Sequence, residues 1–389
     1  MYWVPKMHKK PSKQRFIAAS ACCSTKQLSA AITKCLKVID RYHEYAAKKR
    51  YTCCGINSYW IIGNSSKVHK MIAESNARKN VENIATYDFS TLYTNIPYDK
   101  LKERMSSVIN DAYEGDGHKY ISVYSSGASF VNNPKSTTKA YTKEQLIEMV
   151  NYLIDNCYVT CGDSLFRQKV GIPMGTDCAP FLANLFLFSY ENEWMMRMKS
   201  ENPHLARQFS NSVRYIDDLL TINNDRLMKN YMNEIYPKEL ELKHENSECD
   251  KNASYLDLQL DVVNHEIVTS LYDKRDDFPF KIVNFPDLSG NIPRDGSYGV
   301  FIAQTLRYAK ACAKYTHFMD RTLLLKKQLV QQHFEPAVID RKFQKWMERS
   351  EKAVVLKRYG RHTRDIMSDL RGFQNKDQNT IPTETALVK

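Results

Sequence analysis

The sequence predicts an α+β fold in which antiparallel strands are backed by helices. Several long segments, such as residues 25–49 and 65–83, carry apolar residues at the spacing of amphipathic helices. Residues 157–168 and 213–222 each have two short arms around a turn, the pattern of a hairpin that joins antiparallel strands. The chain has no G-x-G-x-x-G or G-x-x-x-x-G-K segment, which argues against dinucleotide-binding and P-loop folds.

Composition narrows the class of protein. Lys and Arg number 56 against 44 Asp and Glu among 389 residues, and the net charge of +12 favours a polyanionic partner. No stretch approaches the roughly 18 apolar residues of a membrane span, so we expect no membrane partner. The ten cysteines are dispersed without a C-x₂-C pair, which predicts reduced, mostly buried thiols in an intracellular protein rather than structural zinc.

The elements follow in order from a basic amino-terminal patch. The first half is expected to hold a helix over 25–49, a helix over 65–83 and a strand over 84–90. Residues 111–142 lack periodicity and predict a surface insertion, and Thr142 could cap a helix that ends near 156. The second half is expected to contain the hairpin 157–168, an apolar helix over 179–193, the hairpin 213–222, strands over 255–262 and 266–272, a basic helical region over 299–371 and a disordered tail over 374–389.

Three acids stand out. Asp217 and Asp218 lie at the bend of an apolar hairpin, where burial and mutual repulsion are costly unless cations are present. Taken alone, this pair is better explained as an ordinary turn. Asp88, however, ends a strand of its own, and three convergent carboxylates could hold two divalent ions roughly 3.5–4 Å apart for phosphoryl chemistry.

These segments resemble the motifs of reverse transcriptases from Penelope-like retroelements, in the same order over roughly the first 310 residues. Tyr215-Ile-Asp-Asp218 resembles the Y-x-D-D catalytic motif. The first catalytic motif, the nucleotide- and template-contacting motif and the basic finger motif are matched by Asp88-Phe-Ser-Thr-Leu-Tyr-Thr-Asn-Ile-Pro97, by Gln168-Lys-Val-Gly-Ile-Pro-Met-Gly175 with Ala183-Asn184, and by Pro5-Lys-Met-His-Lys9 with Arg15-Phe-Ile17.

The resemblance implies roles for individual residues. Asp88 and Asp217 would ligate two Mg²⁺ ions, with Mn²⁺ as a possible substitute, Asp218 as a less direct third acid and the Phe89 carbonyl completing a shell. Gly171 and Gly175 would let the backbone approach a nucleotide. The remaining dNTP contacts would come from Arg15, Lys9, Lys13, Tyr93 and Gln168, and weaker nucleic-acid contacts from Tyr215, Lys345 and Arg349. Without the resemblance, the basic residues indicate a solvated surface and the glycines a helix-entry turn.

Tyr93 bears on the choice of sugar. It follows Asp88 by five residues, where the family places a side chain under the incoming sugar, and an aromatic ring there excludes a 2′-hydroxyl. We therefore expect dNTPs as substrates rather than rNTPs. The alternative is that Tyr93 is only a core aromatic. Lys243 falls about where a late-palm lysine could protonate pyrophosphate, although its motif is better explained by a surface lysine.

The expected architecture is a right-hand polymerase with an antiparallel palm sheet. The implied domains are amino-terminally incomplete fingers over 1–80, a palm over 81–275 with a finger or insertion segment near 98–167, and a helical basic thumb-like region over 276–373. Gly55-Ile-Asn with Tyr59-Trp-Ile-Ile-Gly63 is interpreted as a turn and strand, so no GIY-YIG nuclease is expected.

The implied activity is RNA-directed DNA polymerisation, with an RNA template, a DNA primer and dNTPs as partners. Two alternatives remain open. One is a catalytically silent nucleic-acid-binding remnant or domesticated copy, and the other is an RNA-dependent RNA polymerase, which Tyr93 disfavours.

Overall fold

The computed structural model describes residues 2–6, 13–172, 174–245, 250–278, 280, 282–349 and 354–372. The chain forms two compact units that divide between Ala253 and Ser254. The predicted finger segment and the palm up to residue 253 lie within the first unit. Palm residues 254–275 and the thumb-like region lie in the second. The predicted disordered tail over 374–389 lies outside the described residues.

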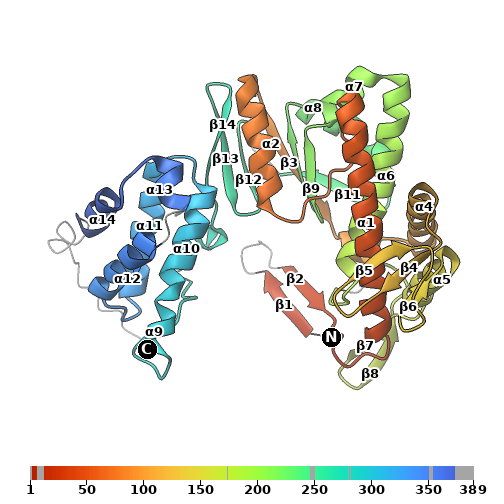
Figure 1. The fold of residues 1–389 in the computed structure, drawn as a ribbon, viewed down its shortest axis with the longest axis horizontal. Helices are drawn as coiled ribbons and strands as arrows, with labels where there is room; N and C mark the ends of the chain where they lie inside the picture. The colour runs from red at the N-terminus through yellow and green to blue at the C-terminus, as the bar shows by residue number, and fades with distance from the viewer. Residues whose placement is uncertain are drawn as a thin grey trace. The chain divides into compact units, whose positions relative to one another are not determined.

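The first unit is built around a four-stranded antiparallel sheet in the order β11-β3-β10-β9 (Figure 1). Its strands are β3 (Ile84–Ser90), β9 (Ser212–Tyr215), β10 (Asp218–Ile222) and β11 (Glu241–His244). The helices of this unit are α1 (Lys26–Cys54), α2 (Ser65–Arg78), α3 (Leu92–Asn95), α4 (Tyr98–Asp116), α5 (Lys143–Asp155), α6 (Ala179–Glu201), α7 (Pro203–Phe209) and α8 (Asp225–Ile235).

Alternation along β3 gives the sheet two different faces. Ala85, Tyr87 and Phe89 are buried on one face, in a core that the long helices α1, α4 and α6 share. Asp88, between Tyr87 and Phe89, therefore belongs to the opposite face and is only half-buried. Burying this alternating apolar set fixes the register of the strand, because a one-residue slip would carry Asp88 into the core.

Local sequence signals account for several helix ends. The Thr142 hydroxyl accepts a hydrogen bond from the Gln145 amide, and the Gln145 side chain accepts one from the Thr142 amide, which is the predicted cap of α5 in its reciprocal form. The Asn64 side chain likewise accepts from the Ser66 amide at the start of α2. Both caps satisfy amide groups that a helix leaves without partners.

The predicted insertion over 111–142 is wrong in part. Residues 111–116 continue α4, and the rest forms a three-stranded sheet in the order β5-β4-β6. Its strands are short and half-exposed, so they lack the long alternating pattern that identifies a strand in sequence. They are β4 (Tyr120–Val123), β5 (Ala128–Val131) and β6 (Lys139–Tyr141).

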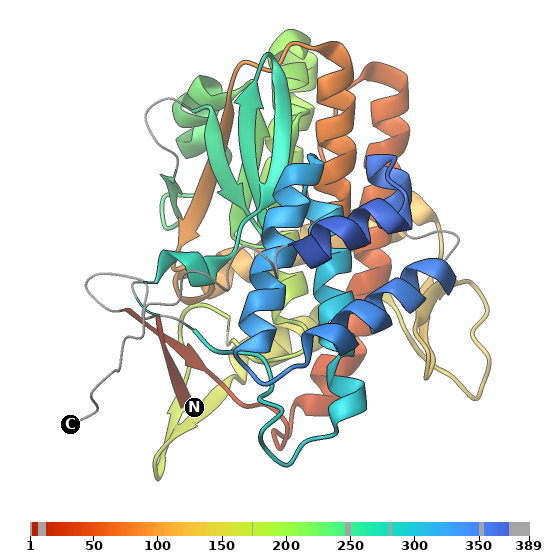
Figure 2. The same cartoon turned by 90° about the vertical axis from the view of Figure 1, so that its left-hand side faces the viewer.

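Two hairpins complete the first unit (Figure 2). β1 (Tyr2–Lys6) pairs with β2 (Lys13–Ile17), and β7 (Tyr158–Cys161) pairs with β8 (Ser164–Arg167), as the sequence predicts for the latter. Ala18, directly after β2, donates its amide to the Met174 carbonyl at 2.7 Å. This bond ties the β1–β2 hairpin to the segment that leads into α6.

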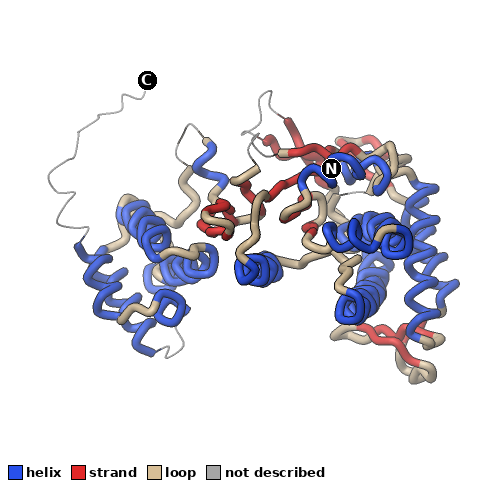
Figure 3. The backbone as a smooth tube through the Cα atoms, turned by 90° about the horizontal axis from the view of Figure 1, so that it is seen from above, coloured by secondary structure: helices blue, strands red, loops and turns tan. Residues whose placement is uncertain are grey.

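The second unit is mainly helical (Figure 3). A small sheet, β12 (Asn252–Tyr255), β13 (Leu258–Val263) and β14 (Glu266–Leu271), begins just before its boundary, and the Thr269 hydroxyl of β14 donates to the Ala311 carbonyl. Its helices are η1 (Lys274–Asp277), α9 (Arg294–Ser297), α10 (Gly299–Ala311), α11 (Tyr315–Val330), α12 (Pro336–Arg349), α13 (Val354–Tyr359) and α14 (Thr363–Gly372).

A buried ion pair between Lys326 and Asp340, 2.7 Å apart, joins α11 to α12 in this helical unit. Lys326 also donates to the Leu370 carbonyl on α14, so one ammonium group connects three helices. In the part of the chain that the structure describes, no helix combines the length and apolar character needed to cross a membrane.

Candidate active site

Strand pairing brings the predicted acids together. In the β3–β10 ladder Asp88 lies directly opposite Asp218, and the Phe89 amide donates to the Asp217 carbonyl at 3.0 Å. Directly opposed residues of an antiparallel pair share a face, with Cβ atoms about 4.5–5.5 Å apart. Asp88 and Asp218 thus lie side by side on the sheet face away from the main core, and Asp217 is adjacent in the β9–β10 turn.

The turn that carries Asp217 has an unusual backbone. Tyr215 pairs with Asp218, which leaves Ile216 and Asp217 as a two-residue loop, and Ile216 has a φ of 55°. A β-branched residue rarely adopts this left-handed conformation, which costs on the order of 1–3 kcal/mol and persists only where its surroundings hold it. The position of Asp217 therefore depends on contacts that stabilise this turn.

The acids offer the carboxylate oxygens that Mg²⁺ prefers. All three are half-buried, and the Phe89 side chain lies in the core, so a metal contact from that residue would have to come from its backbone carbonyl. Among the residues that the structure describes, no three or more His, Cys, Asp or Glu side chains are gathered as metal ligands. The register places carboxylates next to each other, and their oxygens are ligands that suit Mg²⁺. A site for two ions stays a prediction.

Lys243 lies closer to the acids than the sequence indicates. It is directly opposite Asp88 in the β11–β3 ladder, so Lys243, Asp88 and Asp218 form a row across three strands on one face. Its side chain is 54% exposed and its ammonium lies 3.2 Å from Glu241. It is a surface lysine, as expected, but one placed beside the candidate site.

The structure explains why residues 171 and 175 are glycines, and the explanation differs from the predicted nucleotide contact. Both have left-handed φ values, 85° and 119°. A Cβ on Gly171 would lie 2.2 Å from the Tyr93 carbonyl oxygen, and one on Gly175 would lie 1.9 Å from the Ala18 carbonyl oxygen. The close approach that requires glycine is to the protein's own backbone, and nucleotide contact at these positions stays a prediction.

Tyr93 and Gln168 flank this glycine segment. Tyr93, on α3, is half-buried against the main core, and its carbonyl accepts from the Ile172 amide at 2.7 Å. The Gln168 side-chain amide donates to the Val170 carbonyl at 2.9 Å, and its backbone amide donates to the Cys157 carbonyl at 2.9 Å, next to the β7–β8 hairpin. Segment 88–97 and the glycine segment are therefore connected through backbone hydrogen bonds from Gly171 to Ile96 and from Ile172 to Tyr93.

The other predicted contacts are more dispersed. Lys13 and Arg15 lie on β2, and Lys9 lies outside the described residues. Tyr215 ends β9 beside the acids and is half-buried. Lys345 and Arg349 are exposed on α12. They belong to the second unit, whereas the three acids belong to the first.

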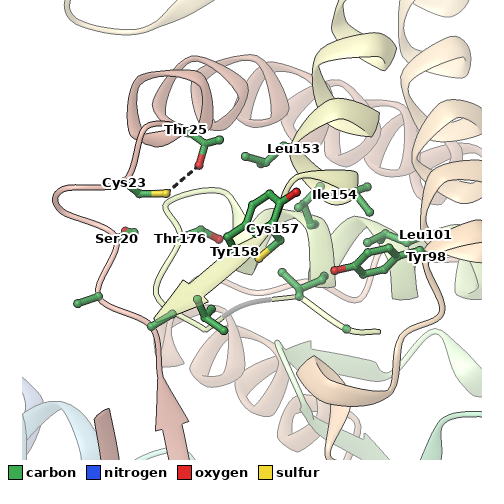
Figure 4. A pocket seen from close by; sticks show the side chains of 16 residues that line it. Ser20, Cys23, Thr25, Tyr98, Leu101, Leu153, Ile154, Cys157, Tyr158 and Thr176 are labelled. Carbon is green, nitrogen blue, oxygen red and sulfur yellow. Dashed lines mark hydrogen bonds between the residues drawn. The ribbon is translucent and has the colours of Figure 1, made fainter. Parts of the chain in front are cut away.

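A small cavity of about 50 Å³ lies beside the glycine segment, because Gly171 and Ile172 are among its lining residues (Figure 4). Apolar side chains such as Leu101, Leu153 and Ile172 dominate its lining, together with Tyr98 and Cys157. Burial raises the pKa of the Cys157 thiol to about 11, so the thiol is neutral at physiological pH. The lining contains none of the three acids, and the cavity has no charged group to bind a triphosphate.

Comparison with solved structures identifies the fold. A telomerase from Candida albicans, solved with a TWJ fragment of telomeric RNA, aligns over 88% of this chain and 56% of its own with a TM-score of 0.58 and 12% identity. The chain has a reverse-transcriptase-like fold. It spans little more than half the length of that telomerase. The predicted α+β polymerase class is thus confirmed at the level of fold.

Two structures of Candida tropicalis telomerase align less closely. The apo form has a TM-score of 0.45 and 12% identity, and the form with the TWJ fragment has a TM-score of 0.43 and 14% identity. They cover 86% and 90% of this chain and 54% and 55% of their own. No protein-family model matches the sequence, and no curated protein does either.

A buried ion pair next to the β9–β10 hairpin is not among the sequence-based expectations. Arg214 on β9 and Glu191 on α6 are both fully buried and hydrogen-bonded to each other. Arg214 comes three residues before Asp217, and a charged residue within an apolar strand arm is the signal that could have revealed it. Glu191 lies within a helix whose other buried residues are mostly apolar, so only the tertiary structure shows its partner.

Proposed function

We propose that this chain is an RNA-directed DNA polymerase of a Penelope-like retroelement, which extends a primer 3′-hydroxyl with dNTPs. The observation that carries the proposal is the register that pairs Asp88 with Asp218 and hydrogen-bonds Phe89 to Asp217. Acids from two segments about 130 residues apart thereby lie next to each other on the two central strands of a sheet, in a chain whose fold is reverse-transcriptase-like. An ordinary Asp-Asp turn would not require the third acid.

The residues would divide the work as follows. Asp88 and Asp217, with Asp218 beside them and the Phe89 carbonyl, would hold two Mg²⁺ or Mn²⁺ ions. Such ions activate the primer hydroxyl and stabilise charge on the leaving pyrophosphate. Arg15, with Lys9 and Lys13, would bind the triphosphate through charge-assisted hydrogen bonds. Tyr93 would lie under the sugar and exclude a 2′-hydroxyl.

An RNA template is the proposed partner. The Candida albicans telomerase that shares the fold was solved with a fragment of telomeric RNA. The net charge of +12 favours a polyanion here as well, because basic side chains release counterions from nucleic acid on binding. The duplex would present an RNA strand and a DNA primer, with the 3′-hydroxyl at the acids.

Primer extension on poly-rA/oligo-dT with Mg²⁺ or Mn²⁺ tests the proposal directly. We expect Asp217→Asn to lower the extension rate on the order of 100-fold or more, equivalent to about 2.7 kcal/mol of transition-state stabilisation. Template–primer affinity should stay the same or rise slightly, since one negative charge near the phosphates is removed.

A matched control is Asp163→Asn, which makes the same change in the exposed turn of the β7–β8 hairpin and should leave extension unchanged. Equal extension by wild type and Asp217→Asn would contradict the proposed site. A wild-type protein that binds template–primer with steep salt dependence but never extends it would support the binding-only remnant instead.

A further inference from the structure

The Arg214–Glu191 pair is fully desolvated. Both side chains have no exposed surface, and two hydrogen bonds join them, from Nε to Oε1 at 2.6 Å and from Nη2 to Oε2 at 3.0 Å. The Tyr236 hydroxyl donates to the same Oε1 at 2.9 Å, and burial, together with the nearby Glu191 carboxylate, raises the pKa of Tyr236 well above its usual value. Burying two charges is expensive, so the pair is weak evidence for stability by itself.

The other edge of the same guanidinium reaches the turn. Arg214 Nη1 donates to the Ile216 carbonyl at 2.8 Å and to Asn184 Oδ1 at 2.9 Å, and Nη2 donates to the Asn184 carbonyl at 3.1 Å. Ile216 is the residue with the left-handed backbone, directly before Asp217. One planar group therefore connects helix α6 to the strained peptide that precedes the candidate catalytic acid.

We infer that Arg214 is a positioning residue, which acts through the Ile216 carbonyl to hold the Asp217 turn in place for the reaction. This inference rests on the proposed function. Glu191 and Asn184 on α6 hold the guanidinium in place. The guanidinium in turn donates to the Ile216 carbonyl of the turn, and the Phe89 amide on β3 donates to the Asp217 carbonyl. The backbone around Asp217 is thereby held from both sides by hydrogen bonds to protein groups.

The geometry requires arginine rather than any cation. Arginine presents five N–H donors in a rigid fork, so it can bind a carboxylate on one edge and carbonyl oxygens on the other. Lysine keeps the charge but has a single ammonium at the end of a flexible chain. It could pair with Glu191 or donate to the Ile216 carbonyl, but it could not hold both in fixed orientation.

Steady-state primer extension with Arg214→Lys tests the inference. We expect kcat to fall at least tenfold while KM for the dNTP stays within twofold, because the fully buried Arg214 side chain has no surface that a nucleotide could contact. Arg207→Lys, the same change at an exposed position on α7, should leave both constants unchanged.

Amide hydrogen exchange supplies a readout that does not depend on activity. The Phe89 amide donates to the Asp217 carbonyl, so release of the turn should speed its exchange at least tenfold in Arg214→Lys. The Leu146 amide, which donates a hydrogen bond to the Thr142 carbonyl at the start of α5, should exchange as in wild type. Unchanged kcat and unchanged Phe89 exchange in a folded Arg214→Lys protein would overturn the inference.

Glu191→Gln decides the matter if Arg214→Lys does not fold. It preserves the shape and one acceptor oxygen, so we expect a smaller loss of kcat with KM unaltered, and unchanged kcat would overturn the inference. Failure of the proposed function looks different. In that case the wild-type protein itself does not extend a primer, whereas faster Phe89 exchange in Arg214→Lys would still report the loosened turn.

Discussion

Tyr93 combines two possible roles in one side chain. It lies half-buried on α3 with its ring packed against the core of the first unit, which fits the simple interpretation of a core aromatic. Its backbone carbonyl also accepts a hydrogen bond from the Ile172 amide, so Tyr93 connects segment 88–97, of which it is part, to the glycine segment. Substrate selectivity separates the two roles, because a core residue changes stability and a sugar-contacting residue changes the choice of nucleotide.

Replacement of Tyr93 should relax sugar discrimination. We expect Tyr93→Ala to admit rNTPs while some dNTP incorporation remains, because the space left by the ring accommodates a hydroxyl. The preference for dNTP over rNTP, measured as the ratio of their kcat/KM values, should fall by the equivalent of about 1–3 kcal/mol, as for other selection by shape. Competitive single-nucleotide incorporation measures it. Tyr93→Phe, which keeps the ring, should discriminate like wild type, and unchanged selectivity in the alanine variant would make Tyr93 a core residue only.

Gly171 should resist even the smallest side chain. A Cβ there would lie 2.2 Å from the Tyr93 carbonyl oxygen, at a left-handed φ, so the two backbone segments would have to separate. We expect Gly171→Ala to lower the free energy of unfolding by about 1–3 kcal/mol. Urea unfolding measures this change. Gly127→Ala, where a Cβ meets nothing within 4 Å, is the control and should unfold like wild type.

At the scale of elements, a buried histidine connects α1 to α4. His43 on α1 makes a hydrogen bond from Nε2 to the Val108 carbonyl at 2.9 Å, and its ring lies 4.9 Å from that of Phe188 on α6. Burial lowers the pKa of His43 from 6.5 to about 4. The neutral His43 ring therefore contacts α4 through its hydrogen bond and α6 through Phe188, and so helps to pack these two helices against α1.

This pKa predicts a stability change on the acid side of neutrality. Between pH 6.5 and about 4 the unfolded chain binds a proton at His43 and the folded chain does not, so stability is present above pH 6.5 and is lost as the pH falls. The loss should reach on the order of 3 kcal/mol near pH 4.

Urea unfolding between pH 4 and 8 measures the effect as the difference between wild type and His43→Gln, which keeps a donor for Val108 but does not titrate. The difference should shrink as the pH falls. His204→Gln, at an exposed position on α7, should follow the wild-type pH profile. A wild-type stability that falls no faster than that of His43→Gln would show that folding does not lower the pKa of His43.

At the scale of the whole molecule, positive charge spans both units. Lys345 and Arg349 are exposed on α12, four residues apart and therefore on one face of the helix. This spacing suits contact with a nucleic-acid backbone, and it also suits an ordinary solvated helix. Salt dependence of binding distinguishes these two interpretations, because each phosphate contact releases counterions.

Removing both charges should weaken the salt dependence of template–primer binding. We expect Lys345→Ala/Arg349→Ala to reduce the slope of log K against log salt concentration by roughly 1–2, since each lost phosphate contact contributes about 0.7–0.9. Fluorescence anisotropy at several salt concentrations measures the slope. Lys70→Ala/Arg78→Ala removes the same charge from the exposed face of α2 and should change the slope less. Equal changes in the two double variants would make α12 an ordinary basic helix.

The sequence by itself determined the features that depend on local pattern and on motif order. The strand that carries Asp88, the two-arm hairpin around Asp217 and the cap at Thr142 could be predicted because each follows from propensity and spacing over a few residues. The order of the motifs led to the α+β polymerase class, which the likeness to a telomerase confirms at the level of fold.

Tertiary structure alone decided which of these residues meet. The row of Lys243, Asp88 and Asp218 depends on strand register, and register is set by burying Tyr87, Phe89 and Leu219 on the opposite face. The reason for Gly171 and the partner of Arg214 depend on segments far away in the chain. Such contacts leave no local signal in a sequence, because burial and pairing arise only when the whole core is assembled.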